Sequence, residues 1–183
     1  GSGSSPLISG YSESHKELEC LISEFLGTQS TIIFSSGYQT NVGVIKSISE
    51  PTDHILIDKL DHASIVDGTL FSKAKFKRYS HNNISDLNEK VNESDKDIIV
   101  CVDSLFSMDG DFAKLNEIQK IKKDKDFYLL VDEAHALGVY GSGGRGLCNE
   151  MNIPMNEMVG ITGTFGKSFG TFGAFFSGSQ DVV

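Results

Sequence analysis

The sequence predicts an α/β fold, a three-layer sandwich in which helices cover a mostly parallel central sheet. Strand-like and helix-like segments alternate along its 183 residues, as in parallel strands joined by crossover helices. Two strand-like segments, DIIVCVDS (97–104) and FYLLVDEAH (127–135), are almost continuously apolar, as expected for strands buried on both faces. No repeat or linker composition interrupts this pattern, so we expect one domain.

The first half of the chain alternates helices with short strands. The first helix is expected to begin at Ser14, which has the capping-box spacing with Glu17, and to end at Gly27. Apolar residues recur between these points at helical spacing: Leu18, Leu21, Ile22, Phe25 and Leu26. The next segments are predicted as strands over 31–35, 54–58 and 76–79, and as helices over 38–48 and 62–73.

The second half continues the alternation. Leu115, Ile118 and Ile121 mark a helix between the two apolar strands, and MVGITGT (158–164) and GAFFSG (173–178) predict two more strands. Ligands of such folds bind where the carboxyl ends of parallel strands meet. Polar residues at these ends are therefore candidates for a site: Ser35, Ser36, Gly37, Asp58, Asp103, Ser104, Asp132 and Thr164.

Composition argues against several classes of function. The formal net charge of −9 disfavours nucleic-acid binding, which requires a basic face. No run approaches the roughly 18 apolar residues of a membrane-spanning helix, and no signal-peptide pattern is present. The three cysteines lack metal-ligand spacing and are typical of a reducing cytoplasm. We therefore expect a cytoplasmic protein with no metal, membrane or nucleic-acid partner.

One lysine lies in an unusual sequence environment. Lys167 is the only charged residue in GITGTFGKSFGTFGAFFSG (160–178), which consists mostly of glycine, hydroxyl and aromatic residues. An ammonium group partly removed from water has a lower pKa and becomes a better nucleophile, so Lys167 is a candidate catalytic amine. A solvated lysine in a glycine-rich loop is the alternative that this segment alone leaves open.

A P-loop ATPase is an interpretation from another class. Asp-Glu-Ala-His (132–135) resembles the magnesium-binding motif of helicase-type ATPases, and Gly-Lys-Ser (166–168) resembles the end of a phosphate-binding loop. That loop requires glycine where this chain has Ile161, and the two motifs occur in reverse order. The ATPase is therefore a distant alternative.

The candidate residues match the needs of pyridoxal 5'-phosphate (PLP). A lysine forms a Schiff base with its aldehyde, and a carboxylate such as Asp132 pairs with its pyridinium nitrogen. Its phosphate requires hydroxyls and backbone N–H groups at a helix start, which the Ser-Ser-Gly-Tyr segment (35–38) supplies.

Seven motifs resemble, in order and spacing, those of the α-oxoamine synthases, fold-type I PLP enzymes that condense an amino acid with an acyl thioester. The motifs are SGYSESHKELE, SSGYQTN, LDHASIVDG, RYSHNN, FSMDGD, VDEAHALGVYGSGGRG and GTFGKSFG. The first and fourth are most similar to the biotin-pathway members. The resemblance covers the whole chain and implies a PLP-binding large domain over residues 1–183, without the C-terminal small domain of the family.

The resemblance assigns roles to eight residues. Lys167 would form the Schiff base and take the Cα proton, Asp132 would pair with the pyridinium nitrogen, and His62 would stack on the ring, so these three are the expected catalytic residues. The other implied cofactor contacts are the phosphate ligands Gly37, Tyr38 and Thr164, His135 at the phenolic oxygen, and Ser107 beside the ring.

This chain departs from the family at two positions. Asp103 replaces a common glutamate, so a contact there would have a shorter reach, and Ser5-Pro6 occupies a region that often includes an arginine. The two arginines, Arg78 and Arg145, do not match the substrate-carboxylate clamp of the family, which lies in the small domain.

The implied reaction is the decarboxylative condensation of L-alanine with a pimeloyl thioester of CoA or a carrier protein. Its product is 8-amino-7-oxononanoate, an intermediate of biotin biosynthesis. Glycine C-acetyltransferase, which uses glycine and acetyl-CoA, or another α-oxoamine synthase is the alternative. Because such enzymes build their active sites at a dimer interface, we expect a homodimer.

Overall fold

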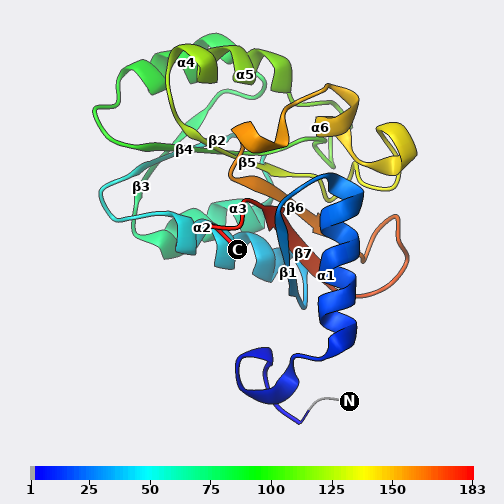
Figure 1. The fold of residues 1–183 in the computed structure, drawn as a ribbon. Helices are drawn as coiled ribbons and strands as arrows, with labels where there is room; N and C mark the ends of the chain where they lie inside the picture. Colours follow the sequence, from blue (N-terminus) through cyan, green and yellow to red (C-terminus); the bar gives the residue numbers. More distant parts are fainter. Residues whose placement is uncertain (1–2) are drawn as a thin grey trace.

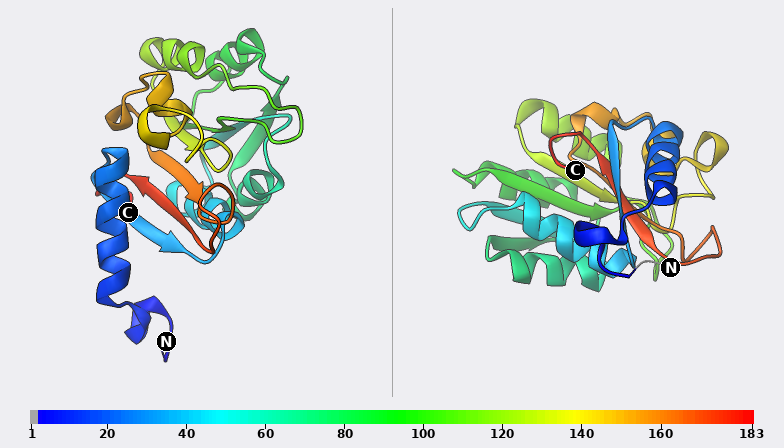
Figure 2. Two further views of the ribbon diagram at one scale, coloured as in Figure 1. Left: turned by 90° about the vertical axis from the view of Figure 1, so that its right-hand side faces the viewer. Right: turned by 60° about the horizontal axis from the view of Figure 1, so that its bottom comes forward.

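The computed structural model describes residues 3–183 and shows one seven-stranded sheet between two layers of helices (Figures 1 and 2). The strand order is β1-β7-β6-β5-β4-β2-β3, and only β7 runs antiparallel to its neighbours. The predicted three-layer, mostly parallel architecture is therefore confirmed. The strands are β1 (Ser30–Phe34), β2 (His54–Asp58), β3 (Lys75–Tyr79), β4 (Ile98–Asp103), β5 (Tyr128–Asp132), β6 (Gly160–Thr164) and β7 (Ala174–Gly178).

Helices connect the strands, and most coincide with segments predicted from the sequence. The helices are α1 (Glu13–Leu26), α2 (Gly37–Ile48), α3 (Ala63–Ser72), α4 (Ile84–Asn92), α5 (Leu115–Asp124) and α6 (Leu147–Glu150). Short helical turns occupy Pro6–Gly10, Ser142–Gly144 and Met155–Glu157. The sequence analysis did not predict α4 or the four-residue α6. None of the helices within residues 3–183 is long and apolar enough to cross a membrane.

The predicted start of the first helix was wrong. Ser12 is the N-cap of α1, and its backbone N–H donates to His15 Nδ1 at 3.2 Å. Ser14 already lies inside the helix because the chain turns helical directly after the extended Ser12. The predicted end is confirmed, since Gly27 has a positive φ of 72° and its N–H donates to the carbonyl of Ser23.

The core consists of two apolar layers, one on each face of the sheet. Strand β4 contributes to both, because successive side chains point to opposite faces. Val100 and Val102 pack in the layer under α1, α4, α5 and α6, whereas Ile99 and Cys101 pack in the layer over α2 and α3. This burial on both faces explains the continuous apolar run at 97–104.

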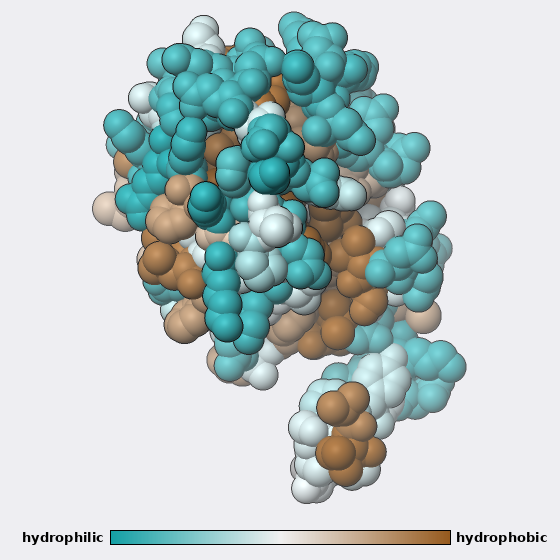
Figure 3. Space-filling view, turned by 90° about the vertical axis from the view of Figure 1, so that its left-hand side faces the viewer, coloured by the Kyte–Doolittle hydropathy of each residue, from teal (hydrophilic) through white to brown (hydrophobic). Residues whose placement is uncertain are grey.

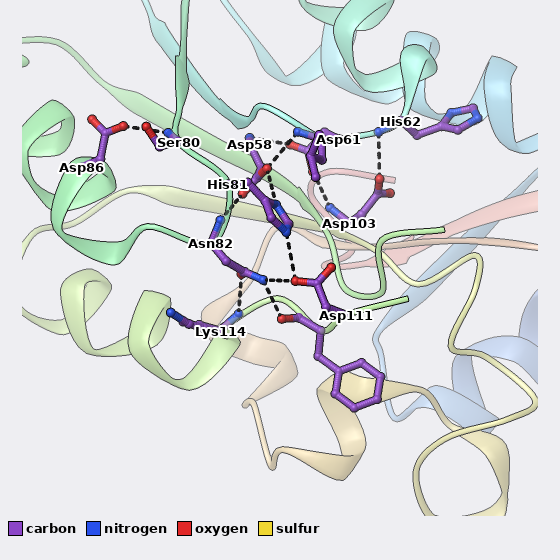
Figure 4. A network of polar contacts seen from close by, with 12 residues as sticks. Asp58, Asp61, His62, Ser80, His81, Asn82, Asp86, Asp103, Asp111 and Lys114 are labelled. Atoms are coloured by element: carbon purple, nitrogen blue, oxygen red, sulfur yellow. Dashed lines mark hydrogen bonds and ion pairs between the residues drawn. The ribbon is translucent and has the colours of Figure 1, made fainter. Parts of the chain in front are cut away.

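A polar network joins the carboxyl ends of β2, β3 and β4 (Figure 4). His81, just after β3, lies between two carboxylates: its Nδ1 is 2.9 Å from Asp58 Oδ1 and its Nε2 is 2.9 Å from Asp111 Oδ2. Asn82 bonds to both of these aspartates, through its backbone N–H and its side-chain amide. Burial alone would lower the pKa of His81, but the hydrogen bonds to Asp58 and Asp111 outweigh it and raise this pKa above the ordinary value of 6.5.

We predict that this network makes folding stability depend on pH. Because folding raises the pKa of His81, its contribution is fully present below about 6.5 and is lost as pH rises through the folded-state pKa. The free energy of unfolding in urea should therefore be larger for the wild type than for a His81→Gln variant, and this difference should decrease with increasing pH. His54→Gln is the control, since His54 bonds a serine hydroxyl rather than a carboxylate. A difference in the free energy of unfolding that stays constant as the pH rises from 6.5 through the folded-state pKa would contradict the prediction.

Candidate active site

A cavity of about 170 Å³ opens where the carboxyl ends of the parallel strands meet. It contains seven of the eight site residues expected from the sequence, contributed by strand ends, loops and helix starts that are far apart in the chain. Its lining residues are Gly37, Tyr38, Asn41, His62, Ser64, Asp103, Asp132, Ala134, His135, Thr164 and Lys167.

Ser107 is the expected site residue that does not line this cavity. It is exposed in the connection between β4 and α5. A turn holds this segment, since the N–H of Phe106 donates to the carbonyl of Asp111 and the N–H of Gly110 to the carbonyl of Phe106. The cofactor contact expected for Ser107 stays a prediction.

Asp132 ends β5, a central strand between β4 and β6, so its carboxylate enters the middle of the cavity. Each carboxylate oxygen accepts one hydrogen bond from a fixed donor. Oδ1 accepts from the N–H of Ala134 at 2.8 Å, and Oδ2 accepts from the amide Nδ2 of Asn41 at 2.6 Å. The carboxylate is thereby held in one orientation, with acceptor capacity left on both oxygens.

His62 lines the cavity as the N-cap of α3. Its Nδ1 accepts from the N–H of Ser64 at 3.2 Å. Its own backbone N–H donates to Asp103 Oδ2 at 2.7 Å (Figure 4). The ring and the backbone of His62 are therefore both anchored before any ligand binds.

Lys167 lies in the turn between β6 and β7, and its Nζ is 2.6 Å from His135 Nε2. At least one of these nitrogens must hold a lone pair for the hydrogen bond to form. Burial lowers the pKa of Lys167, although the charges of Asp132 and Asp103 partly oppose it. Burial, and then the charge of Lys167, lower the pKa of His135. The first shift favours a neutral amine at Lys167 more than in water, and the second favours a neutral imidazole at His135.

The surroundings of Lys167 also exclude the P-loop alternative. A P-loop passes directly into a helix whose N-terminus binds phosphate. Lys167 is instead followed by an irregular turn and the antiparallel strand β7.

The start of α2 forms a third wall of the cavity. Gly37 and Tyr38 occupy its first turn, where backbone N–H groups have no partner within the helix. Thr164 faces this turn, since a Cβ built on Gly37 would lie 3.7 Å from the Thr164 Cβ. Helix N-termini attract anions, so this wall can bind a phosphate group.

Two further carboxyl groups influence the charge of the cavity. Burial, and then the charge of Asp132, raise the pKa of Asp103 to about 8. Burial also raises the pKa of Asp61, which accepts from the backbone N–H groups of Asp58 and Asp103 (Figure 4). The raised pKa favours the protonated form of Asp103 more than in water, which limits the negative charge beside Asp132.

Asn41 and Ser64 line the cavity but were not predicted as site residues from the sequence. Asn41 lies one helical turn after Gly37, on the buried face that continues with Val44 and Ile45. A polar side chain on an apolar helical face is the signal that could have identified it. Ser64 follows His62 by two residues, and its role depends on contacts that the sequence does not show.

Comparisons with known proteins identify the family of this chain. A family model described as aminotransferase class I and II matches residues 1–183. The chain is 40% identical over 183 residues to an 8-amino-7-oxononanoate synthase of Pseudomonas syringae pv. syringae (strain B728a). It is 41% identical over 185 aligned positions to one of Saccharophagus degradans (strain 2-40). Both alignments cover 100% of this chain and 46% of the relative, so the chain spans about half the length of these relatives.

Solved structures of related enzymes are also similar to this chain. A variant of serine palmitoyltransferase from S. paucimobilis, solved with a bound PLP–myriocin aldimine, has a TM-score of 0.94 and 32% identity, covering 98% of this chain and 46% of that one. An 8-amino-7-oxononanoate synthase from Francisella tularensis has a TM-score of 0.85 and 31% identity, covering 94% and 50% of the two chains. The relatives to which it is similar are α-oxoamine synthases, and the chain itself belongs to the aminotransferase class I and II family.

Proposed function

We propose that the chain is the PLP-binding large domain of an enzyme that condenses L-alanine with a pimeloyl thioester, with loss of carbon dioxide, to give 8-amino-7-oxononanoate. One observation carries this proposal: seven of the eight residues that the motifs imply line a single cavity. The identity of about 40% to relatives named for this product supports the choice of substrates.

The cavity residues fit PLP by their chemistry. Asp132 keeps acceptor capacity on both oxygens and is suited to a protonated ring nitrogen. The first N–H groups of α2 and the hydroxyl of Thr164 would hold the phosphate at the wall that the start of α2 forms. Lys167 offers an amine of lowered pKa in the same cavity. His62 and His135 would contact the ring and its phenolic oxygen.

When bound, PLP supplies an electron sink that stabilises a carbanion next to the substrate nitrogen. Asp132 would keep the proton on the ring nitrogen that this electron withdrawal requires. Lys167 would remove and return the Cα proton, a task favoured by its lowered pKa. His135 Nε2, 2.6 Å away, would orient the Lys167 amine between these steps. His62 would form a wall that keeps water from the reacting carbon.

We propose a homodimer as the active assembly, with a second copy covering exposed apolar surface. The segment Pro6–Gly10 and the N-terminal part of helix α1 extend from the body (Figures 1 and 2), and Leu7 and Ile8 are 92% and 77% exposed. Figure 3 shows apolar surface at the tip of this projection. Phe172, 81% exposed, lies in the same β6–β7 connection as Lys167. Large exposed apolar residues mark interfaces, so the active site would lie close to the partner subunit.

We propose a cytoplasmic location for this enzyme. Cys20, Cys101 and Cys148 are all free thiols in the structure, and the last two are buried. Free buried thiols persist in a reducing compartment, where disulfides are rare. Soluble substrates such as an amino acid and an acyl thioester are available there.

The first prediction concerns the amine that binds the cofactor. After incubation with PLP, borohydride reduction and digestion, the pyridoxyl mass should be found on the peptide containing Lys167. Lys167→Ala should remove this label, because the lowered pKa and the cavity contacts belong to this lysine. Lys114→Ala, at an exposed position, is the control and should keep it. A label on another lysine in the wild-type protein would refute the assignment.

The second prediction concerns the carboxylate. Asp132→Asn should retain bound PLP but reduce turnover roughly 30- to several thousand-fold, since losing a charge-assisted bond to a buried cation costs about 2–5 kcal/mol. The new amide would also face the Asn41 amide that now donates to Asp132. Steady-state kinetics against an Asp126→Asn control, at a fully exposed carboxylate, measures the loss. Turnover equal to wild type would show that another carboxylate has this role.

The third prediction concerns the substrates. An enzyme containing this chain should turn over L-alanine with a pimeloyl thioester faster than glycine with acetyl-CoA or serine with a palmitoyl thioester. The serine pair tests the structural similarity to serine palmitoyltransferase. Product mass spectrometry identifies each amino ketone, with Lys167→Ala as the inactive control. Preference for either competing pair would overturn the substrate assignment while leaving the reaction class intact.

A further inference from the structure

One ring nitrogen of His62 receives two hydrogen-bond donors. The backbone N–H of Ser64 lies 3.2 Å from Nδ1, and the Ser64 hydroxyl oxygen lies 2.7 Å from the same atom. A backbone N–H can only donate, so Nδ1 must hold a lone pair rather than a proton. The Ser64 hydroxyl then also donates to Nδ1, and in the neutral ring the proton is on Nε2.

Asn41 continues this series of hydrogen bonds in a fixed direction. Having donated its only proton, the Ser64 oxygen accepts from Asn41 Nδ2 at 2.9 Å. The same Nδ2 donates to Asp132 Oδ2 at 2.6 Å, and the hydroxyl of Thr162 donates to Asn41 Oδ1 at 2.9 Å. A rotated Asn41 amide would place Oδ1 against the Asp132 carboxylate. Because that carboxylate can only accept hydrogen bonds, it sets the orientation of the amide.

Burial isolates the middle of this series of hydrogen bonds from water. Asn41 and Thr162 are 2% exposed, and Ser64 is fully buried. A buried polar group left without its partner costs about 1–3 kcal/mol, so water does not readily replace a lost member of the series. The directions of all of these hydrogen bonds are therefore fixed together.

We infer that Asn41 and Ser64 are positioning residues that hold His62 as its Nε2–H tautomer, and that Asn41 links this tautomer to the Asp132 carboxylate. The importance of this for catalysis rests on the proposed function. The cavity then has a hydrogen-bond donor at the His62 wall and an acceptor at Asp132, and one buried amide holds both. The opposite tautomer would set Nδ1–H against the Ser64 N–H and remove the N-cap of α3.

The tautomer can be measured directly by long-range proton–nitrogen NMR of protein labelled with ¹⁵N-histidine, in alkaline buffer and without cofactor. The protein contains five histidines, and His62→Gln identifies the signals of His62 by their loss. We expect the nitrogen shifts of an unprotonated Nδ1 and a protonated Nε2. A protonated Nδ1, or an equal mixture of tautomers, would overturn the inference.

Variants test which residues hold the tautomer. Ser64→Ala should reduce the preference for Nε2–H at least about fivefold, the factor that corresponds to one hydrogen bond of about 1 kcal/mol. Asn41→Ala should shift the ratio in the same direction, because the Ser64 hydroxyl loses the donor that orients it. The control is Ser47→Ala, since Ser47 bonds only within its own helix, to the carbonyl of Val44. An unchanged ratio in Ser64→Ala would contradict the assignment.

The test of the His62 tautomer can fail or succeed independently of the test of the proposed function. Failure of PLP to label Lys167, with His62 found as Nε2–H, would remove the function and leave the tautomer assignment standing. Labelling of Lys167, with His62 found as Nδ1–H, would do the reverse. The wild-type spectrum decides the inference even where a variant does not fold.

Discussion

The geometry of the cavity depends on a carboxylate kept in one place at the end of a central strand. Asp132 is only 8% exposed, and a buried charge is tolerated only where fixed donors replace water. The N–H of Ala134 and the amide of Asn41 are those donors. Helix α2 must therefore pack where Asn41 can reach β5, and this same packing brings the start of α2 to the cavity.

The strand order turns this local constraint into a complete site. β5 lies between β4 and β6, so Asp103, Asp132 and Thr164 come to the same edge from three segments of the sequence. The His81 network secures the neighbouring edge by joining the ends of β2 and β3 to the connection after β4. Asp61 and Asp103 connect the two regions, because Asp61 holds the N–H of Asp103 and Asp103 holds that of His62.

The sequence alone predicted the central strands β4 and β5 and the residues at their ends, because burial on both faces requires continuous apolar runs that are visible without a structure. It failed where a side chain acts through a distant partner. Asn41 is 91 residues from Asp132 in sequence, and no pattern in the neighbouring residues indicates that contact. Helix α4 had a visible signal in Ile84, Leu87 and Val91, which recur at helical spacing, but the segment is short and mostly polar. The loop of Ser107 carries no periodicity that would fix its conformation.

The position of β1 has a consequence for the order in which the protein assembles. Within residues 3–183 its only strand partner is β7, and Thr31 and Ser177, whose hydroxyls meet across this pair, are 146 residues apart. On a growing polypeptide β1 is made early but can join the sheet only after β7 has left the ribosome. Contacts between such distant residues form slowly, because a long loop must close first. Helix α2 follows directly on β1, so the wall of the cavity at the start of α2 is completed late.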